Sequence, residues 1–523
     1  MNFKIEKKYQ LIIILSLTAM VVLFVWRSDS PYPLSLDWDL YAHWHVFNAM
    51  RHGYISIFPS HISDTFLLNT YLPVFAVITG VFRYVFGFLS QTGFYFVADS
   101  IHFTLNVMVG AFLGYATTKR YSVALVSGLL AAFIYESVVA QTSMFFIPQN
   151  LAALLIVSGV AFWLIEHKKV ASTLLLSSFL IHYVIGVLGV LILLLLLASD
   201  YIKHKIKFSI PRVLPLVGIV TVIGAIIFAY FGEFNPFSST ESAQLTFGLL
   251  VKMDYLVTWY SFLIVGYVVG IWYVLKSQST NKNLILGLSL GLLAAVILPI
   301  PYSLKLFTVG RYFINVILAI GIVSLVDSFT HRVVRILGFS ILWLILLNLF
   351  IHNAATFKSA FPYHGVVSTV STYELKAIDY IKEAYSKRDY GSVLLVSDPA
   401  TQHVFEALTG INSQGGAFST NETRNLISQT YRAPEVDSLL QLFTIKDGII
   451  IKDVDTILLI VSGRYIQWQS LPDEKITDQT FNVWAPRDLT ARAFEYIDKL
   501  EKTGVATKVF SNHGVAVFEI NKP

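Results

Sequence analysis

Residues Leu11–Trp26 read LIIILSLTAMVVLFVW, an uninterrupted run without a charge that sets the kind of fold this chain adopts. Lys4, Lys7 and Lys8 precede the run, and no small-residue cleavage site follows it. An apolar run with lysines on one flank is typical of a membrane-spanning helix whose basic end stays in the cytoplasm. We therefore predict an uncleaved first span with the N-terminus inside.

The composition of the whole chain, 523 residues, also indicates a membrane protein. Hydrophobic residues make up 55% of the chain and charged residues 14%, whereas soluble domains carry about 25% charged residues. The sequence therefore predicts a polytopic α-helical membrane protein. More than half of the charged residues nevertheless lie beyond Thr356. This asymmetry predicts two domains, a transmembrane domain over residues 1–354 and a soluble α/β domain over residues 355–523. The absence of cysteine excludes disulfides, thiolate metal sites and cysteine nucleophiles.

Eleven apolar segments are candidate spans. They are Tyr9–Trp26, Phe94–Thr117, Val123–Ala140, Pro148–Ile165, Val170–Tyr183, Val184–Tyr201, Val213–Phe231, Leu256–Lys276, Leu284–Pro299, Tyr312–Asp327 and Val333–Ile351.

The segment Phe66–Phe88 decides the topology. It is apolar enough to cross a bilayer but contains Pro73, Gly80, Arg83 and Gly87. If it does not cross, the basic residues in the connectors between later spans face the cytoplasm, as the positive-inside rule requires; if it crosses, they all move outside. We therefore expect juxtamembrane helices on the outer face. The result is about eleven spans in the plasma membrane, with a cytoplasmic N-terminus and an extracytoplasmic C-terminal domain.

Soon after the first span, the chain reads Leu36-Asp37-Trp38-Asp39-Leu40-Tyr41-Ala42-His43. If a helix begins at Asp39, then Asp39 and His43 lie one turn apart on the same face. Ionisable groups at a membrane boundary are costly, so they pair with one another or take part in chemistry. The alternative is that either aspartate only caps the following helix.

Three short motifs resemble those of GT-C-fold glycosyltransferases, polytopic enzymes that use polyprenyl-phosphate-linked sugars. The first is Asp37-Trp38-Asp39 after the first span. The second, Asn69-Thr70-Tyr71-Leu72-Pro73 through Phe82-Arg83-Tyr84-Val85-Phe86-Gly87, is similar to the Tyr-Pro-Pro-Leu…Arg-Leu-Phe-Gly juxtamembrane segment of that class. The third is Val309-Gly310-Arg311-Tyr312-Phe313, which opens a late span.

The layout is similar to that of protein mannosyltransferases, aminoarabinose transferases and oligosaccharyltransferases, many of which append an extracytoplasmic domain. The chain has no Trp-Trp-Asp run like that of the oligosaccharyltransferase catalytic subunit. Transfer to asparagine is therefore not expected, and a lipid-linked or surface glycan is the favoured acceptor.

The resemblance implies transfer of a hexosyl or pentosyl group from a polyprenyl-phosphate donor to a glycan, lipid or protein acceptor at the outer face, with inversion. Asp39, or in second place Asp37, is expected to take the proton of the acceptor hydroxyl. His43 would orient that carboxylate or bind the acceptor. Arg311 and Lys305 are expected to bind the phosphate of the leaving group. The alternative for Arg311 is that it snorkels to lipid headgroups.

Other polar residues predicted at the outer level are candidates for substrate binding. Asp99 and Glu136 lie near the outer ends of neighbouring spans and suit sugar hydroxyls. His102 lies one turn from Asp99 and either pairs with it or contacts substrate. His182 lies at the bend between two short spans, where a packed histidine is the alternative.

The sequence establishes no cofactor, and a divalent cation, Mn²⁺ or Mg²⁺, is the one candidate. Asp37, Asp39, Asp99 and Glu136 would supply the oxygen ligands that such ions prefer, although the spacing of these carboxylates does not establish a metal site. The expected partners are the lipid-linked donor, the acceptor and the bilayer; no nucleic-acid partner is expected.

The C-terminal domain shows short alternating elements. Residues 372–387 have the periodicity of an amphipathic helix. Residues 392–397 and 456–462 suit buried strands, residues 401–408 suit a helix ending at Gly410, and residues 505–509 and 514–520 suit a terminal hairpin. We expect a small α/β domain with an accessory role in positioning the acceptor.

Two other functions fit part of the pattern. A transporter or flippase of a lipid-linked or polar substrate would also place charges and broken helices in the membrane. However, the sequence shows no inverted repeat, and the ionisable residues gather at the outer boundary rather than the midplane. A non-catalytic glycan-assembly subunit is the second alternative, because a fold persists without its chemistry.

Overall fold

The computed structural model describes residues 6–28, 74–134, 146–205, 260–297, 306–351, 370–413, 421–444, 454–463 and 488–523, with gaps of one or two residues inside some of these ranges. The chain divides into two compact units. One comprises Met1–Trp26 and Ala98–Phe357, and the other comprises Arg27–Val97 and Lys358–Pro523.

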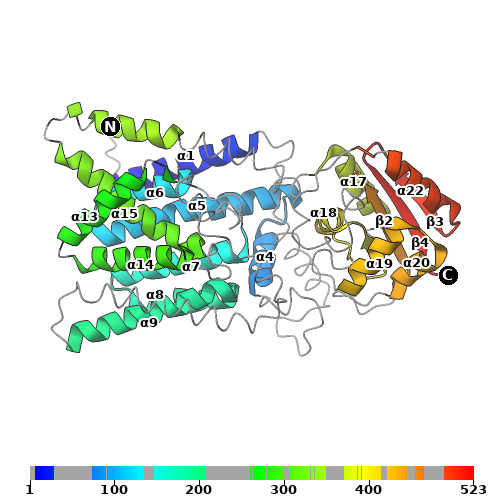
Figure 1. Cartoon of the computed structure of the whole chain (residues 1–523), viewed down its shortest axis with the longest axis horizontal. Coiled ribbons are helices and arrows are strands. Elements are labelled where there is room, and N and C mark those ends of the chain that lie inside the picture. Colours follow the sequence, from blue (N-terminus) through cyan, green and yellow to red (C-terminus); the bar gives the residue numbers. More distant parts are fainter. Residues whose placement is uncertain are drawn as a thin grey trace. The chain divides into compact units, whose positions relative to one another are not determined.

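The first unit is a bundle of apolar helices (Figure 1). Its described helices are α1 (Lys7–Ser28), α5 (Gln91–Thr118, which begins in the second unit), α6 (Tyr121–Phe133), α7 (Pro148–Leu164), α8 (Lys168–Ile181), α9 (Tyr183–Lys205), α13 (Leu263–Lys276), α14 (Thr280–Ile297), α15 (Phe307–Ser328) and a helix over Ile336–Asn348. Every predicted span that falls in the described part of the chain overlaps one of these helices. Val213–Phe231 lies outside the described residues.

The described helices differ in whether they are long enough to cross a membrane. Among the described residues, α1, α5, α9 and α15 contain stretches long and apolar enough to cross a bilayer by length and composition. The helices over 121–133, 148–164, 263–276 and 336–348 are apolar but shorter. The helices are therefore confirmed, whereas the number of about eleven spans stays a prediction.

Helix α15 forms the centre of the bundle, because α6, α7, α13 and α14 all pack against it. Its side chains are buried from Phe307 through Val323. Helix α13 approaches it most closely: a Cβ atom placed on Gly270 would lie 2.1 Å from the Ile317 carbonyl oxygen, and one on Gly321 would lie 2.1 Å from the Gly266 carbonyl oxygen. Glycine at these positions allows the two backbones to touch.

Helix α4 (Val74–Val85) is the described part of the predicted juxtamembrane segment 66–88. Phe75 and Thr79 are buried on one of its faces, while Val81, Tyr84 and Val85 are exposed. Such an amphipathic helix is typical of a chain segment that lies in a membrane interface. Its placement on the outer face remains a prediction.

The C-terminal part of the second unit is a four-stranded sheet with helices on both faces. Strands β1 (Val393–Val396), β2 (Thr456–Ser462), β3 (Ala506–Ser511) and β4 (Val515–Asn521) pair in the order β1-β2-β4-β3. The β1–β2 pair is parallel, with Leu395 opposite Leu458; the other two pairs are antiparallel, with Leu459 opposite Phe518. Strands β1 and β2 are buried along their whole length, as expected for strands covered on both faces.

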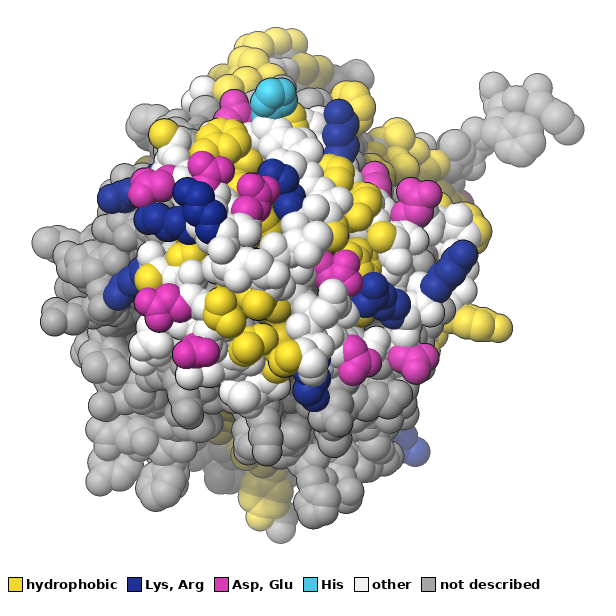
Figure 2. Space-filling view, turned by 90° about the vertical axis from the view of Figure 1, so that its right-hand side faces the viewer, with side chains coloured by type: hydrophobic (Ala, Val, Ile, Leu, Met, Phe, Trp, Pro, Cys, Tyr) yellow, Lys and Arg dark blue, Asp and Glu magenta, His cyan; other side chains and the backbone are white. Residues whose placement is uncertain are grey.

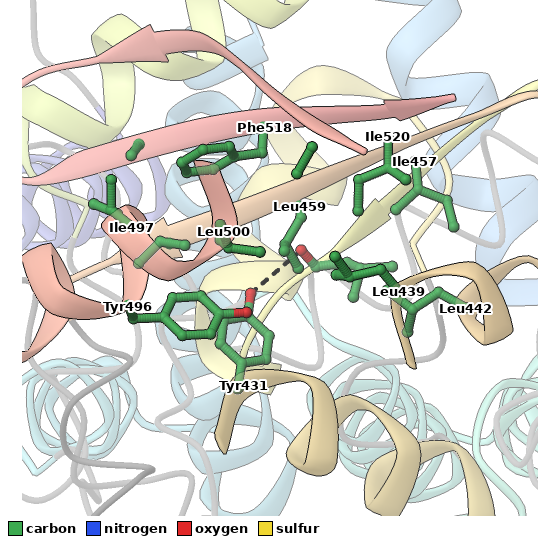
Figure 3. Close-up of a cluster of buried hydrophobic side chains, with 14 of the residues drawn as sticks. Tyr431, Leu439, Leu442, Ile457, Leu459, Tyr496, Ile497, Leu500, Phe518 and Ile520 are labelled. Atoms are coloured by element: carbon green, nitrogen blue, oxygen red, sulfur yellow. Dashed lines mark hydrogen bonds between the residues drawn. The ribbon is translucent and has the colours of Figure 1, made fainter. Parts of the chain in front are cut away.

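The helices of this sheet domain are α17 (Thr372–Tyr385), α18 (Pro399–Thr409), α19 (Asn421–Arg432), α20 (Val436–Gln441), the 3₁₀ turn η5 (Leu442–Thr444) and α22 (Ala491–Lys502). One face of the sheet packs against α19, α20 and α22 around Leu459 and Phe518 (Figure 3). The Tyr431 and Tyr496 rings stack there with centroids 5.5 Å apart, and the Tyr431 hydroxyl donates to the Ile460 carbonyl at 2.6 Å. Figure 2 shows basic and acidic side chains interspersed over the described surface of the face in view.

The elements expected from the sequence of this domain are confirmed. Asp398 begins α18, where its Oδ1 accepts a hydrogen bond from the Thr401 amide at 3.0 Å, and Gly410 ends the helix with φ of 75°. Only glycine adopts that backbone conformation without strain. Helices α19, α20 and α22 were not anticipated.

Candidate functional site

The predicted site residues divide between the described and the undescribed parts of the chain. Asp37, Asp39, His43, Glu136 and Lys305 lie outside the described residues. Asp99, His102, His182 and Arg311 are described, and all four are buried. Three of these four, Asp99, His102 and Arg311, belong to a polar region between α5, α7 and α15.

Arg311 lies one turn into α15, because that helix begins at Phe307 rather than at the predicted Tyr312. Its side chain is 4% exposed. The Arg311 Nη2 atom donates to the Tyr312 hydroxyl at 3.1 Å, and the guanidinium carbon lies 4.8 Å from the centroid of the Tyr312 ring. A buried cation therefore lies against an aromatic face, an arrangement that stabilises it electrostatically.

The Tyr312 hydroxyl links Arg311 to helix α5. It donates to the Asn106 Oδ1 atom, and the Asn106 Nδ2 atom donates to the His102 carbonyl at 3.1 Å. Asn106 and Tyr312 are both about 1% exposed. A directed chain of hydrogen bonds thus runs from the guanidinium on α15 to the backbone of α5.

His102 and Asp99 lie on α5 close to the beginning of α7. The Asp99 Oδ1 atom accepts a hydrogen bond from the Phe146 amide at 2.8 Å. The His102 ring packs against the Phe146 ring with centroids 5.7 Å apart, and it interacts electrostatically with Arg311. The arrangement thus brings His102 and Arg311 into one region, while their roles in substrate and phosphate binding stay predictions.

Several buried nitrogen and oxygen atoms in this region have no hydrogen-bond partner among the described residues. They are His102 Nε2, Gln149 Nε2, Thr308 Oγ1 and Arg311 Nε. Buried polar groups are normally hydrogen-bonded, and leaving one unpaired costs about 1–3 kcal/mol. Two of these atoms, the Gln149 Nε2 amide nitrogen and Arg311 Nε, can only donate, so a ligand rich in acceptor oxygens would satisfy them.

Sequence reasoning missed Asn106, Tyr312, Thr308 and Gln149. A signal was present in the helical spacing, since His102 and Asn106 are four residues apart on α5 and Thr308 and Arg311 are three apart on α15. Nothing in a single sequence shows that these two helix faces meet.

His182 occupies the break between α8 and α9. Its Nδ1 atom accepts a hydrogen bond from the Ile185 amide at 3.2 Å, and its ring stacks on Tyr183 at 6.2 Å. A Cβ atom on Gly186 would lie 2.1 Å from the Phe179 Cα atom, so the two helices are tightly apposed at this bend. His182 therefore caps α9 in this structure, and its role in substrate binding stays a prediction.

The metal prediction concerns mainly undescribed residues. In the described part of the chain, no three His, Cys, Asp or Glu side chains are grouped to hold an ion. Asp99 is the one described member of the predicted ligand set, and one oxygen of its carboxylate is occupied by the Phe146 amide. Mn²⁺ or Mg²⁺ binding by Asp37, Asp39, Asp99 and Glu136 stays a prediction.

No protein-family model matches the chain, and no curated protein matches it either. Several solved structures do match the chain. The archaeal oligosaccharyltransferase AglB from Archaeoglobus fulgidus, in complex with an inhibitory peptide and a dolichol-phosphate, superposes with a TM-score of 0.53 at 11% identity, over 93% of this chain and 72% of that one. The apo form of the Archaeoglobus fulgidus oligosaccharyltransferase gives a TM-score of 0.57 at 10% identity, over 92% and 72%.

A third structure, of the Archaeoglobus fulgidus oligosaccharyltransferase tethered by a disulfide to an acceptor peptide containing the NVT sequon, gives a TM-score of 0.54 at 10% identity, over 87% of this chain and 69% of that one. The similarity extends over both units of the chain. The fold is therefore GT-C-like, as the sequence motifs predicted.

Proposed function

We propose that this chain is an integral membrane glycosyltransferase. It moves a sugar from a polyprenyl-phosphate donor to a glycan, lipid or protein acceptor at the outer face of the plasma membrane. The observation that carries the proposal is the buried Arg311 in a GT-C-like fold. Its Nε–H group has no hydrogen-bond partner among the described residues, and its guanidinium interacts electrostatically with His102. One of the similar structures holds a dolichol-phosphate, which is a ligand of the proposed chemical class.

In the proposed reaction, the acceptor hydroxyl attacks the anomeric carbon, the bond from that carbon to the phosphate oxygen breaks, and the configuration inverts. Asp39, or in second place Asp37, takes the hydroxyl proton as the new bond forms. The phosphate leaves with the electron pair and an additional negative charge. Arg311 stabilises that charge, together with Lys305, because a guanidinium donates paired hydrogen bonds to phosphate oxygens. His43 and Glu136 contact the acceptor or the sugar, and His102 and Asp99 line the same region.

The test uses purified full-length protein in nanodiscs with a radiolabelled polyprenyl-phosphate sugar, and it follows release of the sugar from the lipid. We expect Asp37→Asn combined with Asp39→Asn to lower the rate by about 10²-fold or more, the contribution of a positioned base. Asp437→Asn, on α20 of the sheet domain, is the matched carboxylate control and should keep the wild-type rate. Sugar release that survives the double substitution would refute the mechanism.

The same preparation separates this proposal from its alternatives. A flippase would move the intact lipid-linked sugar across a vesicle bilayer without cleaving it. A non-catalytic assembly subunit would bind the donor and release no sugar. Either result would overturn the proposed activity.

A further inference from the structure

We infer that Tyr312 and Asn106 are positioning residues, which direct the Arg311 guanidinium toward the donor phosphate. The inference rests on the proposed function. It concerns two side chains whose role does not follow from the chemistry of phosphate binding itself, since neither carries a charge.

The geometry of the hydrogen bonds supports this role. Arg311 Nη2 donates to the Tyr312 hydroxyl, which in turn donates to Asn106 Oδ1. The Asn106 amide nitrogen donates to the His102 carbonyl, so both polar ends of the amide are held. The Tyr312 hydroxyl and the Asn106 amide each accept from one neighbour and donate to the next. Such chains polarise one another and fix the orientation of every member.

Only part of the guanidinium takes part in this chain. Nη2 is bound to the Tyr312 hydroxyl, whereas Nε has no partner among the described residues. The Tyr312 ring also lies under the guanidinium carbon. One edge and one face of the guanidinium are therefore held by Tyr312, and the Nε–H group stays available. A long arginine side chain held in this way loses less conformational entropy when it binds an anion.

The anchoring residues belong to different helices. Asn106 lies on α5 and Tyr312 on α15, separated by more than 200 residues of sequence. The two helices are close here, because a Cβ atom on Gly110 of α5 would lie 3.7 Å from the Tyr312 ring. The orientation of Arg311 thus depends on the packing of α5 against α15 and not on its own helix alone.

The chain also offers a matched control. The Tyr260 hydroxyl donates to the Asn315 Oδ1 atom at 3.1 Å, and Asn315 lies one turn after Arg311 on α15. Tyr260→Phe therefore removes a buried tyrosine–asparagine hydrogen bond to the same helix without touching the bond that holds Arg311. Tyr312→Phe removes the chemically equivalent group from the Arg311 chain.

The experiment measures binding of two lipids, undecaprenyl phosphate and undecaprenol, to the full-length protein in nanodiscs. The ratio of the two affinities isolates recognition of the phosphate, because the lipids share the same prenyl chain. We expect Arg311→Ala to lower this ratio by about 10- to 100-fold, the value of a hydrogen bond to a charged group. Tyr312→Phe and Asn106→Leu should lower it by about 3- to 10-fold, the value of a neutral hydrogen bond, while Tyr260→Phe should leave it unchanged.

A double-mutant cycle tests whether Tyr312 acts through Arg311. In the Arg311→Ala background, Tyr312→Phe should cause no further loss of phosphate preference, because the group that it positions is gone. Additive losses would overturn the inference, as would a Tyr312→Phe protein that matches Tyr260→Phe or that loses both lipids equally. If Arg311→Ala itself keeps the wild-type ratio, the phosphate site of the proposed function fails as well.

Discussion

Glu519 on β4 accepts hydrogen bonds from two residues of the sheet domain. The Tyr385 hydroxyl donates to its Oε2 atom at 2.9 Å, and Arg388 Nη2 donates to its Oε1 atom at 3.1 Å. The Arg388 guanidinium also lies 4.8 Å from the centroid of the Tyr385 ring. Burial of the phenol and its hydrogen bond to Glu519 raise the pKa of Tyr385 above its ordinary value.

This shift predicts a pH-dependent effect of Tyr385→Phe. At pH 8 the substitution should lower the free energy of unfolding of the sheet domain by about 1 kcal/mol, the value of one hydrogen bond. Because the pKa is raised in the folded state, the stabilisation is fully present below about pH 10 and is lost as the pH rises further. Subtilisin cleavage of full-length protein between pH 8 and pH 11 should show the two proteins converging at high pH. A gap that widens with pH would contradict the assignment.

At the scale of elements, the contact between α13 and α15 depends on glycine. Gly270 faces the Ile317 carbonyl, and Gly321 faces the backbone of Gly266 and Gly270. Between apolar helices in a membrane, association relies on close packing rather than on the hydrophobic effect. The position of α15, and with it that of Arg311, therefore depends on the absence of side chains at these glycines.

We predict that Gly270→Ala separates the two helices and destabilises the bundle by about 1–3 kcal/mol, the usual cost of overpacking. The measurement is the temperature at which detergent-purified protein loses its monodisperse peak in size-exclusion chromatography. Gly338→Ala is the control, since a Cβ atom there would lie 3.5 Å from the nearest atom, an ordinary contact. Equal behaviour of the two variants would show that the helices are not closely packed at Gly270.

At the scale of the helical unit, two contacts orient α5 and α15 in parallel. Asn106, near the middle of α5, meets Tyr312 in the first half of α15. Arg120, just after α5, pairs with Asp327 near the end of α15. Lys168 at the start of α8 similarly pairs with Asp200 near the end of α9. The basic residues of these ion pairs belong to connectors that the positive-inside rule assigns to the cytoplasm. We therefore predict that the polar region around Arg311 faces the opposite side of the membrane.

This arrangement predicts the location of the C-terminus. A phosphatase reporter that is active only outside the cytoplasm should be active when fused after Pro523. The same reporter inserted between Ser277 and Thr280, a connector expected to be cytoplasmic, should be inactive. The reverse pattern would mean that the segment Phe66–Phe88 crosses the membrane.

Local sequence patterns were sufficient to predict the described helices of the bundle and most elements of the sheet domain. Long apolar runs, the capping Asp398 and the terminal Gly410 are local signals, and each acts over a few residues. Helices α19, α20 and α22 were not predicted. In α22 the buried residues do recur at helical spacing, at Ala493, Tyr496, Ile497 and Leu500, so a local signal was present there.

The motifs Asp37-Trp38-Asp39 and Val309–Phe313 also pointed to the GT-C-like fold from the sequence alone. Which polar side chains meet became clear only from the packing of the helices. The sequence marked Arg311 as a candidate for phosphate binding at the end of a span, but its burial and its hydrogen-bonded partners Tyr312 and Asn106 came from the structure. So did the contact of Gly270 with Ile317. These contacts join helix faces that are far apart in the chain, and the free energy of each depends on packing that no local pattern encodes.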